Sequence, residues 1–154
     1  MARFSKFRKR MQERLIDGVD IKLSKRVTSA FEGSTVLRLV VMYKGDTMIN
    51  YPQCKDAKNE SYVSYNYGST MHHIMSFIDS YFLYKHETAF NMTAEQIIMD
   101  AQGSYFFEAI VDDLLLILKV CDRRTGKRRL WRLFNSGGLP ENIKNIIKDR
   151  LKGD

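Results

Sequence analysis

The sequence has few of the residues that define whole classes of protein. Only two of its 154 residues are cysteines and only two are prolines. Cys54 and Cys121 lie far apart and no Cys-x-x-Cys occurs, so they predict neither a disulfide framework nor a zinc site. We expect both thiols to be reduced, as in a cytosolic or nuclear protein.

Long apolar runs are also missing. The longest, residues 109–118, is interrupted by Asp112 and Asp113 and is too short to cross a bilayer. The N-terminus is basic but no apolar stretch follows it, so we expect no secretory leader. Any contact with a membrane is therefore expected to be peripheral.

The motifs of common catalytic sites do not occur. There is no Gly-x-Gly-x-x-Gly, Walker loop, Gly-x-Ser-x-Gly or His-Glu-x-x-His. His72 and His73 are adjacent, and on a helix they would point about 100° apart, so they cannot share a metal there. Asp112 and Asp113 could serve a metal-dependent nuclease, but their position between apolar runs favours a turn. We predict no enzyme, no catalytic residue, no metal and no cofactor.

Positive charge, by contrast, is abundant. Lysine and arginine number 25 against 18 acidic residues, which gives a net charge of +7. A surplus of this sign favours polyanionic partners, either nucleic acid or an anionic membrane surface. Hydrophobic residues make up 44% of the chain, enough for the core of one domain of ordinary size.

The first basic cluster is at the N-terminus. Residues 2–17 are predicted to form an amphipathic helix, because apolar residues recur there at spacings of three and four. Such a helix can insert into an anionic leaflet, bind RNA, or pack on its own domain or another subunit. We therefore treat residues 1–17 as a basic amphipathic arm and 18–154 as the main domain. The predicted membrane-binding residues are Arg3, Phe4, Lys6, Phe7, Arg8, Lys9, Arg10 and Arg14.

The rest of the chain predicts one α+β domain, a mostly antiparallel sheet of five or six strands with helices packed on one face. Ser69 is expected to cap one helix, Thr93 and Gln96 form a candidate capping box, and Pro140 begins the last helix. The predicted strands are residues 21–27, 35–43, 47–51, 105–111, 114–120 and 128–134, and the predicted helices are 69–84, 94–100 and the segment after Pro140.

The second basic cluster lies between residues 119 and 132, at the expected tip of a hairpin. It comprises seven cations against one acid, Asp122. Arginine suits phosphate because its guanidinium donates two parallel hydrogen bonds. Trp131 could stack on a base, but its alternation with Arg132 and Leu133 favours a place in the core. The predicted nucleic-acid-binding residues are Lys119, Arg123, Arg124, Lys127, Arg128, Arg129 and Arg132; a weaker third group is Lys144, Lys148, Arg150 and Lys152.

Several segments carry a resemblance to a known family. Residues 105–120, the basic turn after them, residues 129–134 and the closing helix resemble the matrix proteins of bornaviruses, which are non-segmented negative-strand RNA viruses. Residues 19–25 and 36–41 are also similar. The resemblance spans about residues 19–152 and is poor over 52–92. The basic N-terminal helix is longer than in bornaviruses, which leaves a related rhabdovirus-like or nyamivirus-like lineage open.

This resemblance implies a structural viral protein. Such a matrix protein would self-associate on an anionic membrane and bind the viral ribonucleoprotein or RNA during assembly and budding. It would be found in the virion, in the host cytoplasm and at the inner face of the host membrane, and the resemblance leaves the nucleus open as a further location. The chain has no Pro-Pro-x-Tyr or Pro-Thr-Ala-Pro budding motif. The alternative reading of the residues is a soluble regulator, of phage or other origin, that binds nucleic acid without a membrane.

Overall fold

The computed structural model describes residues 2–28, 34–51, 67–100 and 108–153. Within these residues the protein is α+β, with seven helices and one antiparallel sheet of three strands. The predicted sheet of five or six strands is therefore wrong. The elements are α1 (Ala2–Arg14), β1 (Val19–Thr28), β2 (Ser34–Tyr43), β3 (Asp46–Tyr51), α2 (Tyr67–Leu83), α3 (His86–Asn91), α4 (Ala94–Asp100), α5 (Glu108–Cys121), α6 (Lys127–Asn135) and α7 (Glu141–Lys152).

The sheet follows the alternation of its sequence. Its strands run in the order β1-β2-β3, and Ile21 faces Val41, which faces Ile49 in turn. These three side chains are buried, whereas neighbours such as Lys22 are exposed. A two-residue period of this kind gives a sheet one apolar face. The prediction of these three strands is confirmed, within one or two residues at their ends.

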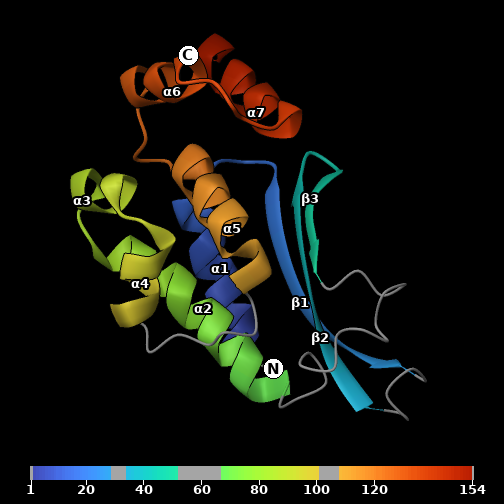
Figure 1. The fold of residues 1–154 in the computed structure, drawn as a ribbon. Coiled ribbons are helices and arrows are strands. Elements are labelled where there is room, and N and C mark those ends of the chain that lie inside the picture. Colours follow the sequence, from blue (N-terminus) through green and yellow to red (C-terminus); the bar gives the residue numbers. More distant parts are fainter. Residues whose placement is uncertain (1, 29–33, 52–66, 101–107, 154) are drawn as a thin grey trace.

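The apolar face of the sheet is covered by helices. Figure 1 shows α1, α2 and α5 on one side of the three strands, and α1 contacts β1, α2 contacts β2 and α5 contacts β3. The helices α3 and α4 extend this layer away from the sheet. The pair α6 and α7 lies across one end of the molecule, near the C-terminus and far from the N-terminal end of α1.

The strands predicted between residues 105 and 134 are helices wherever the structure describes them. Residues 108–121 form α5 and residues 127–135 form α6, while 105–107 lie outside the described residues. A helix packed on several sides becomes apolar nearly all round, and α5 contacts β3, α4 and α7. Its continuous apolar run therefore resembled a buried strand. Asp112 and Asp113 are exposed on α5 and form no turn.

Several local signals are confirmed. Thr93 and Gln96 form the capping box: the backbone N–H of Thr93 donates to Gln96 Oε1, and that of Gln96 donates to Thr93 Oγ1. The last helix begins directly after Pro140 and buries Ile143 on its inner side. Ser69 lies inside α2, which begins at Tyr67, so its predicted capping role is wrong.

The end of α1 is attached to the C-terminal half by its backbone. Leu15 and Asp122 form an isolated antiparallel bridge. The N–H of Ile16 donates to the Cys121 carbonyl at 2.9 Å, and the N–H of Arg123 donates to the Arg14 carbonyl at 3.0 Å. The N-terminal helix is therefore built into the domain, with its C-terminal end held beside the α5–α6 loop.

Candidate nucleic-acid interface

The apolar side of α1 faces the core. Phe7, Met11 and Leu15 are all buried there. The structure therefore removes Phe7 from the surface predicted for membrane insertion, because the helix has packed on its own domain. Lys6 and Lys9 are exposed. The side chains of Arg3 and Phe4 lie outside the described residues, so their predicted contact with a membrane stays a prediction.

The arginines of α1 are paired with carboxylates from other elements. Arg8 binds Asp20 of β1 through two hydrogen bonds of 3.0 and 2.8 Å. Arg10 and Arg14 share Asp79 of α2, with N–O distances of 2.9 and 3.0 Å. The spacing of four residues places both guanidinium groups over the same helix partner. These three cations fasten α1 to the sheet and to α2.

The α5–α6 loop is organised around Asp122, a carboxylate with no exposed surface. It accepts hydrogen bonds from the Tyr81 hydroxyl at 2.9 Å, from the Arg124 backbone at 2.9 Å and from the Arg124 guanidinium at 3.0 Å. Burial, and next the negative charge of Asp122, raises the pKa of Tyr81. Arg124 also donates to the Tyr84 carbonyl, and Arg123 pairs with Asp17 at 2.9 Å. Both arginines therefore have structural partners.

Lys119 and Arg129 lie beside the aromatic ring of Phe90. Lys119 Nζ donates to the Met92 carbonyl at 2.8 Å and lies 5.9 Å from the ring centroid. Burial lowers its pKa. The guanidinium of Arg129 lies 5.4 Å from the same centroid, so two of the predicted nucleic-acid-binding cations are held against α3.

The remaining cations of the second cluster lie on the exposed side of α6. Leu130 points inward and is buried, while Lys127, Arg128, Trp131 and Arg132 are exposed. We call these four residues the α6 outer face. Among the described residues none of its three cations has a carboxylate partner, whereas Arg8, Arg10, Arg14, Arg123 and Arg124 all do. Uncompensated positive charge is therefore concentrated at the α6–α7 end of the molecule.

Trp131 is at the centre of this face. Its side chain is 56% exposed, and its ring is parallel to that of Phe134, with 6.2 Å between centroids and 4° between planes. The prediction that Trp131 belongs to the core is wrong, because it assumed a strand. With 100° between successive helical residues, Trp131 falls between Lys127 and Arg128 on α6 and lies 100° away from the buried Leu130. An indole this exposed leaves one ring face available for stacking.

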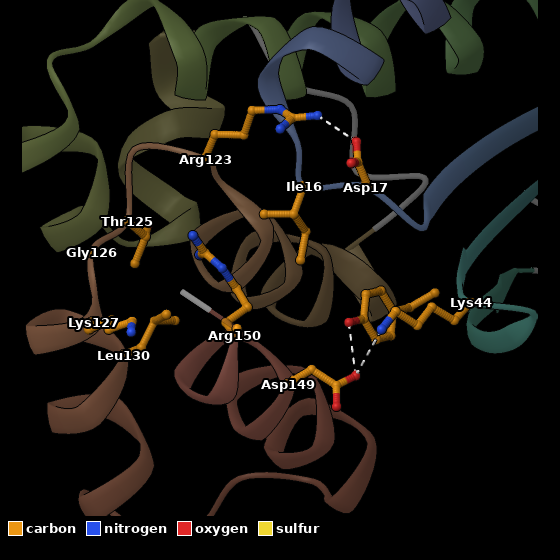
Figure 2. A pocket seen from close by; sticks show the side chains of 12 residues that line it. Ile16, Asp17, Lys44, Arg123, Thr125, Gly126, Lys127, Leu130, Asp149 and Arg150 are labelled. Atoms are coloured by element: carbon orange, nitrogen blue, oxygen red, sulfur yellow. Dashed lines mark hydrogen bonds and ion pairs between the residues drawn. The ribbon is translucent and has the colours of Figure 1, made fainter.

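A pocket of about 600 Å³ opens beside the start of α6. Figure 2 shows Arg150 of α7 in the middle of the pocket, with Arg123 on one side, Lys127 on another and Lys44 across from it. The sequence pattern missed Lys44, because a lysine in a β-turn carries no local signal of a site. Its position depends on the N–H of Lys44 donating to the Gly18 carbonyl at 2.8 Å, a contact between distant segments.

Comparison with known proteins adds no relative. No protein-family model, curated protein or solved structure matches this chain. The resemblance to bornavirus matrix proteins therefore stays a prediction from the sequence. In the described part of the chain, no helix has both the length and the apolarity needed to cross a bilayer. The same residues contain no cluster of three or more histidine, cysteine or acidic side chains arranged for a metal ion.

Proposed function

We propose that this protein is a non-enzymatic structural protein that binds single-stranded RNA on the α6 outer face. The observation that carries the proposal is Trp131, more than half exposed among three cations that lack carboxylate partners in the described residues. Proteins that bind single strands combine stacking on aromatic side chains with cations that track the phosphates. The α6 outer face offers both on one short helix.

The α6 outer face is a better candidate than α1, the other basic helix. To bind phosphate, Arg8 would have to leave Asp20, and Arg10 and Arg14 would have to leave Asp79. Each exchange gives up an existing ion pair and returns little net free energy. The cations of α6 have no such competitor among the described residues, so their interaction with an added anion is not offset.

RNA suits this face better than a membrane does. Insertion into a leaflet needs a contiguous apolar stripe pointing outward. On α6 the apolar residues Leu130, Leu133 and Phe134 pack toward the core, and only Trp131 stands among the exposed cations. One aromatic ring surrounded by positive charge resembles a stacking platform more than an insertion surface.

The matrix assignment adds further properties to this proposal. Self-association, attachment to an anionic membrane and a place in the virion rest on the resemblance of the sequence alone. The mass of the native particle tests self-association: a discrete multimer favours the matrix-type protein. A monomer that binds RNA and ignores anionic vesicles favours the soluble regulator instead.

The direct test is binding of a fluorescent single-stranded RNA, titrated at several salt concentrations. Trp131→Ala should weaken binding about tenfold, since stacking contributes roughly 1–3 kcal/mol per base. The double variant Arg128→Gln with Arg132→Gln should reduce the slope of log K against log salt by about 1.4, or about 0.7 for each lost phosphate contact.

A matched control removes the same charge elsewhere. The double variant Lys6→Gln with Lys9→Gln neutralises two exposed cations of α1, and we expect its affinity to stay within about twofold of the unaltered protein, the residual effect being long-range attraction. Equal losses in the α6 and α1 variants would show that total charge, and not the α6 outer face, determines binding. A different outcome would assign the α6 outer face to a membrane: Trp131→Ala would reduce flotation with anionic vesicles and leave RNA binding unchanged.

A further inference from the structure

The pocket beside α6 has an unequal balance of charge. Four cations line it, Lys44, Arg123, Lys127 and Arg150, against the two carboxylates Asp17 and Asp149. Arg123 is paired with Asp17 at 2.9 Å and Lys44 is paired with Asp149 at 3.5 Å. Both ion pairs are drawn as dashed lines in Figure 2. No carboxylate of the described residues forms an ion pair with Lys127 or Arg150; the buried Asp122 attracts Arg150 from a distance but is itself paired with Arg124. Within these residues, two positive charges of the pocket are therefore without an ion-pair partner of their own.

Arg150 is held in position before any ligand arrives. Its Nη1 donates to the carbonyls of Val120 and Asp122 at 2.9 and 3.1 Å. Its Nε and Nη2 have no hydrogen-bond partner among the described residues. Figure 2 shows the side chain rising from α7 into the middle of the pocket. A guanidinium fixed through one nitrogen keeps its other donors for an oxyanion and loses little conformational entropy on binding.

The rest of the lining suits a ligand larger than a single ion. Ile16 and Leu130 contribute apolar surface. The hydroxyl of Tyr43 donates to Asp149 Oδ2 at 2.9 Å, which holds this carboxylate on the side away from Lys127. Pockets of about 300–1,000 Å³ are the usual size for small-molecule ligands, and this one lies within that range.

We propose that this pocket binds a phosphomonoester group, held by Lys127 and Arg150. The two charges of Lys127 and Arg150 match a group that carries between about −1.5 and −2 at pH 7, whereas an internal phosphodiester of a strand carries only one. The phosphate belongs either to a free phosphorylated small molecule or to the end of an RNA strand. The second source rests on the proposed function, because Lys127 belongs both to the pocket lining and to the α6 outer face.

The test compares RNA strands of one sequence with a 5′-phosphate, a 3′-phosphate or no terminal phosphate. We expect one phosphorylated strand to bind about tenfold more tightly than the unphosphorylated strand, consistent with a charge-assisted contact. Lys127→Gln should bring this ratio to within about twofold of one. Lys127 is exposed, so its substitution leaves the core unaltered. Arg128→Gln, the neighbouring control outside the pocket lining, should weaken both strands and leave the ratio unchanged.

The free source is tested with inorganic phosphate, at constant ionic strength against chloride. Phosphate should shift the backbone amide resonances of residues 125–127 in the full chain, and Lys127→Gln should abolish the shift. If phosphate shifts these resonances but the phosphorylated and unphosphorylated strands bind equally, the pocket is assigned to a free phosphorylated molecule. A ratio of one together with no phosphate-specific shift would overturn the proposal. A separate result would contradict the RNA-binding proposal, namely a Trp131→Ala variant that binds every strand as tightly as the unaltered protein.

Discussion

The helices α1 and α6 have similar compositions and different surroundings. Both are short, basic and amphipathic, and both carry aromatic residues. In α1 the aromatic Phe7 is buried and three arginines bind Asp20 and Asp79. In α6 the aromatic Trp131 is exposed and the neighbouring cations have no carboxylate among the described residues. The first helix is part of the framework, and the second presents its chemistry to solvent.

The difference arises from residues far away in the sequence. Asp79 of α2 reaches Arg10 and Arg14 across more than sixty positions, whereas α6 packs mainly on α7 at one end of the fold. Local charge density is therefore a poor guide to a binding surface. Whether a basic helix binds a partner depends on the acids that the fold brings to it.

The largest expected effect separates the two aromatic residues. Phe7→Ala should lower the free energy of unfolding by about 3–5 kcal/mol, because it leaves a cavity in the core. Trp131→Ala should lower it by less than about 1 kcal/mol, because its side chain is mostly exposed. Urea unfolding monitored by far-ultraviolet circular dichroism gives both values without relying on tryptophan fluorescence. Equal losses would contradict the contrast between the two helices.

The next effect concerns Asp122, the buried carboxylate around which the α5–α6 loop is organised. Asp122→Asn should destabilise the protein by about 3 kcal/mol, because the buried partner of Arg124 and Tyr81 loses its charge. Asp112→Asn is the matched control, since Asp112 is exposed on α5, the helix that ends just before Asp122, and it should change stability by less than about 0.5 kcal/mol. The shift in urea midpoint measures both, and a small effect at Asp122 would show that the loop is held by packing alone.

A third variant leaves two arginines of α1 without a carboxylate partner, as the cations of the α6 outer face are in the described part of the chain. Asp79→Asn removes the carboxylate that Arg10 and Arg14 share. We expect stability to fall by about 1 kcal/mol, as for partly exposed pairs. RNA affinity at low salt should rise by no more than about twofold, the same limit that is expected for the exposed lysines of α1, because the freed arginines act only through long-range attraction. Fluorescence titration measures the change, and a gain of about fivefold or more would show that α1 binds RNA directly.

The smallest effect concerns pH. His86 Nε2 lies 2.7 Å from Thr125 Oγ1, whose own proton is donated to the Lys119 carbonyl, so the imidazole is the donor. Burial is the main cause that lowers the pKa of His86 below its usual value of about 6.5. The folded state therefore favours the neutral ring. Its contribution to stability is complete above about pH 6.5 and is lost as the pH falls through the folded pKa.

Substitution isolates this contribution from that of the acidic residues. His86→Gln keeps a donor for Thr125 but does not titrate. Unfolding free energies measured between pH 5 and 7.5 should fall more steeply toward low pH in the unaltered protein than in His86→Gln. Parallel curves would show that the pKa of His86 is the same in the folded and unfolded states.

The parts of the fold that follow from local pattern were predictable. The three strands alternate, the Thr93–Gln96 box caps its helix, and the final helix begins after Pro140. Residues 108–134 were not, because the apolar runs on either side of the exposed Asp112 and Asp113 resembled two buried strands joined by a turn. In α6, Arg132 and Leu133 alternate as in a strand, although Leu130, Leu133 and Phe134 have helical spacing.

The candidate site was predictable only in part. The basic residues of α6 could be named from the sequence because they are contiguous. The misassigned strand placed Trp131 in the core. Ion pairs distinguish the arginines with a structural role from those that are free to bind a ligand. Arg123 pairs with Asp17 and Arg124 pairs with Asp122, and only the first of these pairs depends on the tertiary fold. The pocket joins Lys44 to Arg150, residues that nothing local connects.

The backbone bridge between Leu15 and Asp122 has a consequence for the order of synthesis. The first helix leaves the ribosome long before its partner segment exists, and translation proceeds at about 5–20 residues per second. For roughly ten seconds the nascent chain therefore carries an amphipathic segment whose docking surface has not been made. A chaperone that covers the emerging Phe7–Leu15 stripe during this interval would protect the chain from aggregation until residue 122 is available.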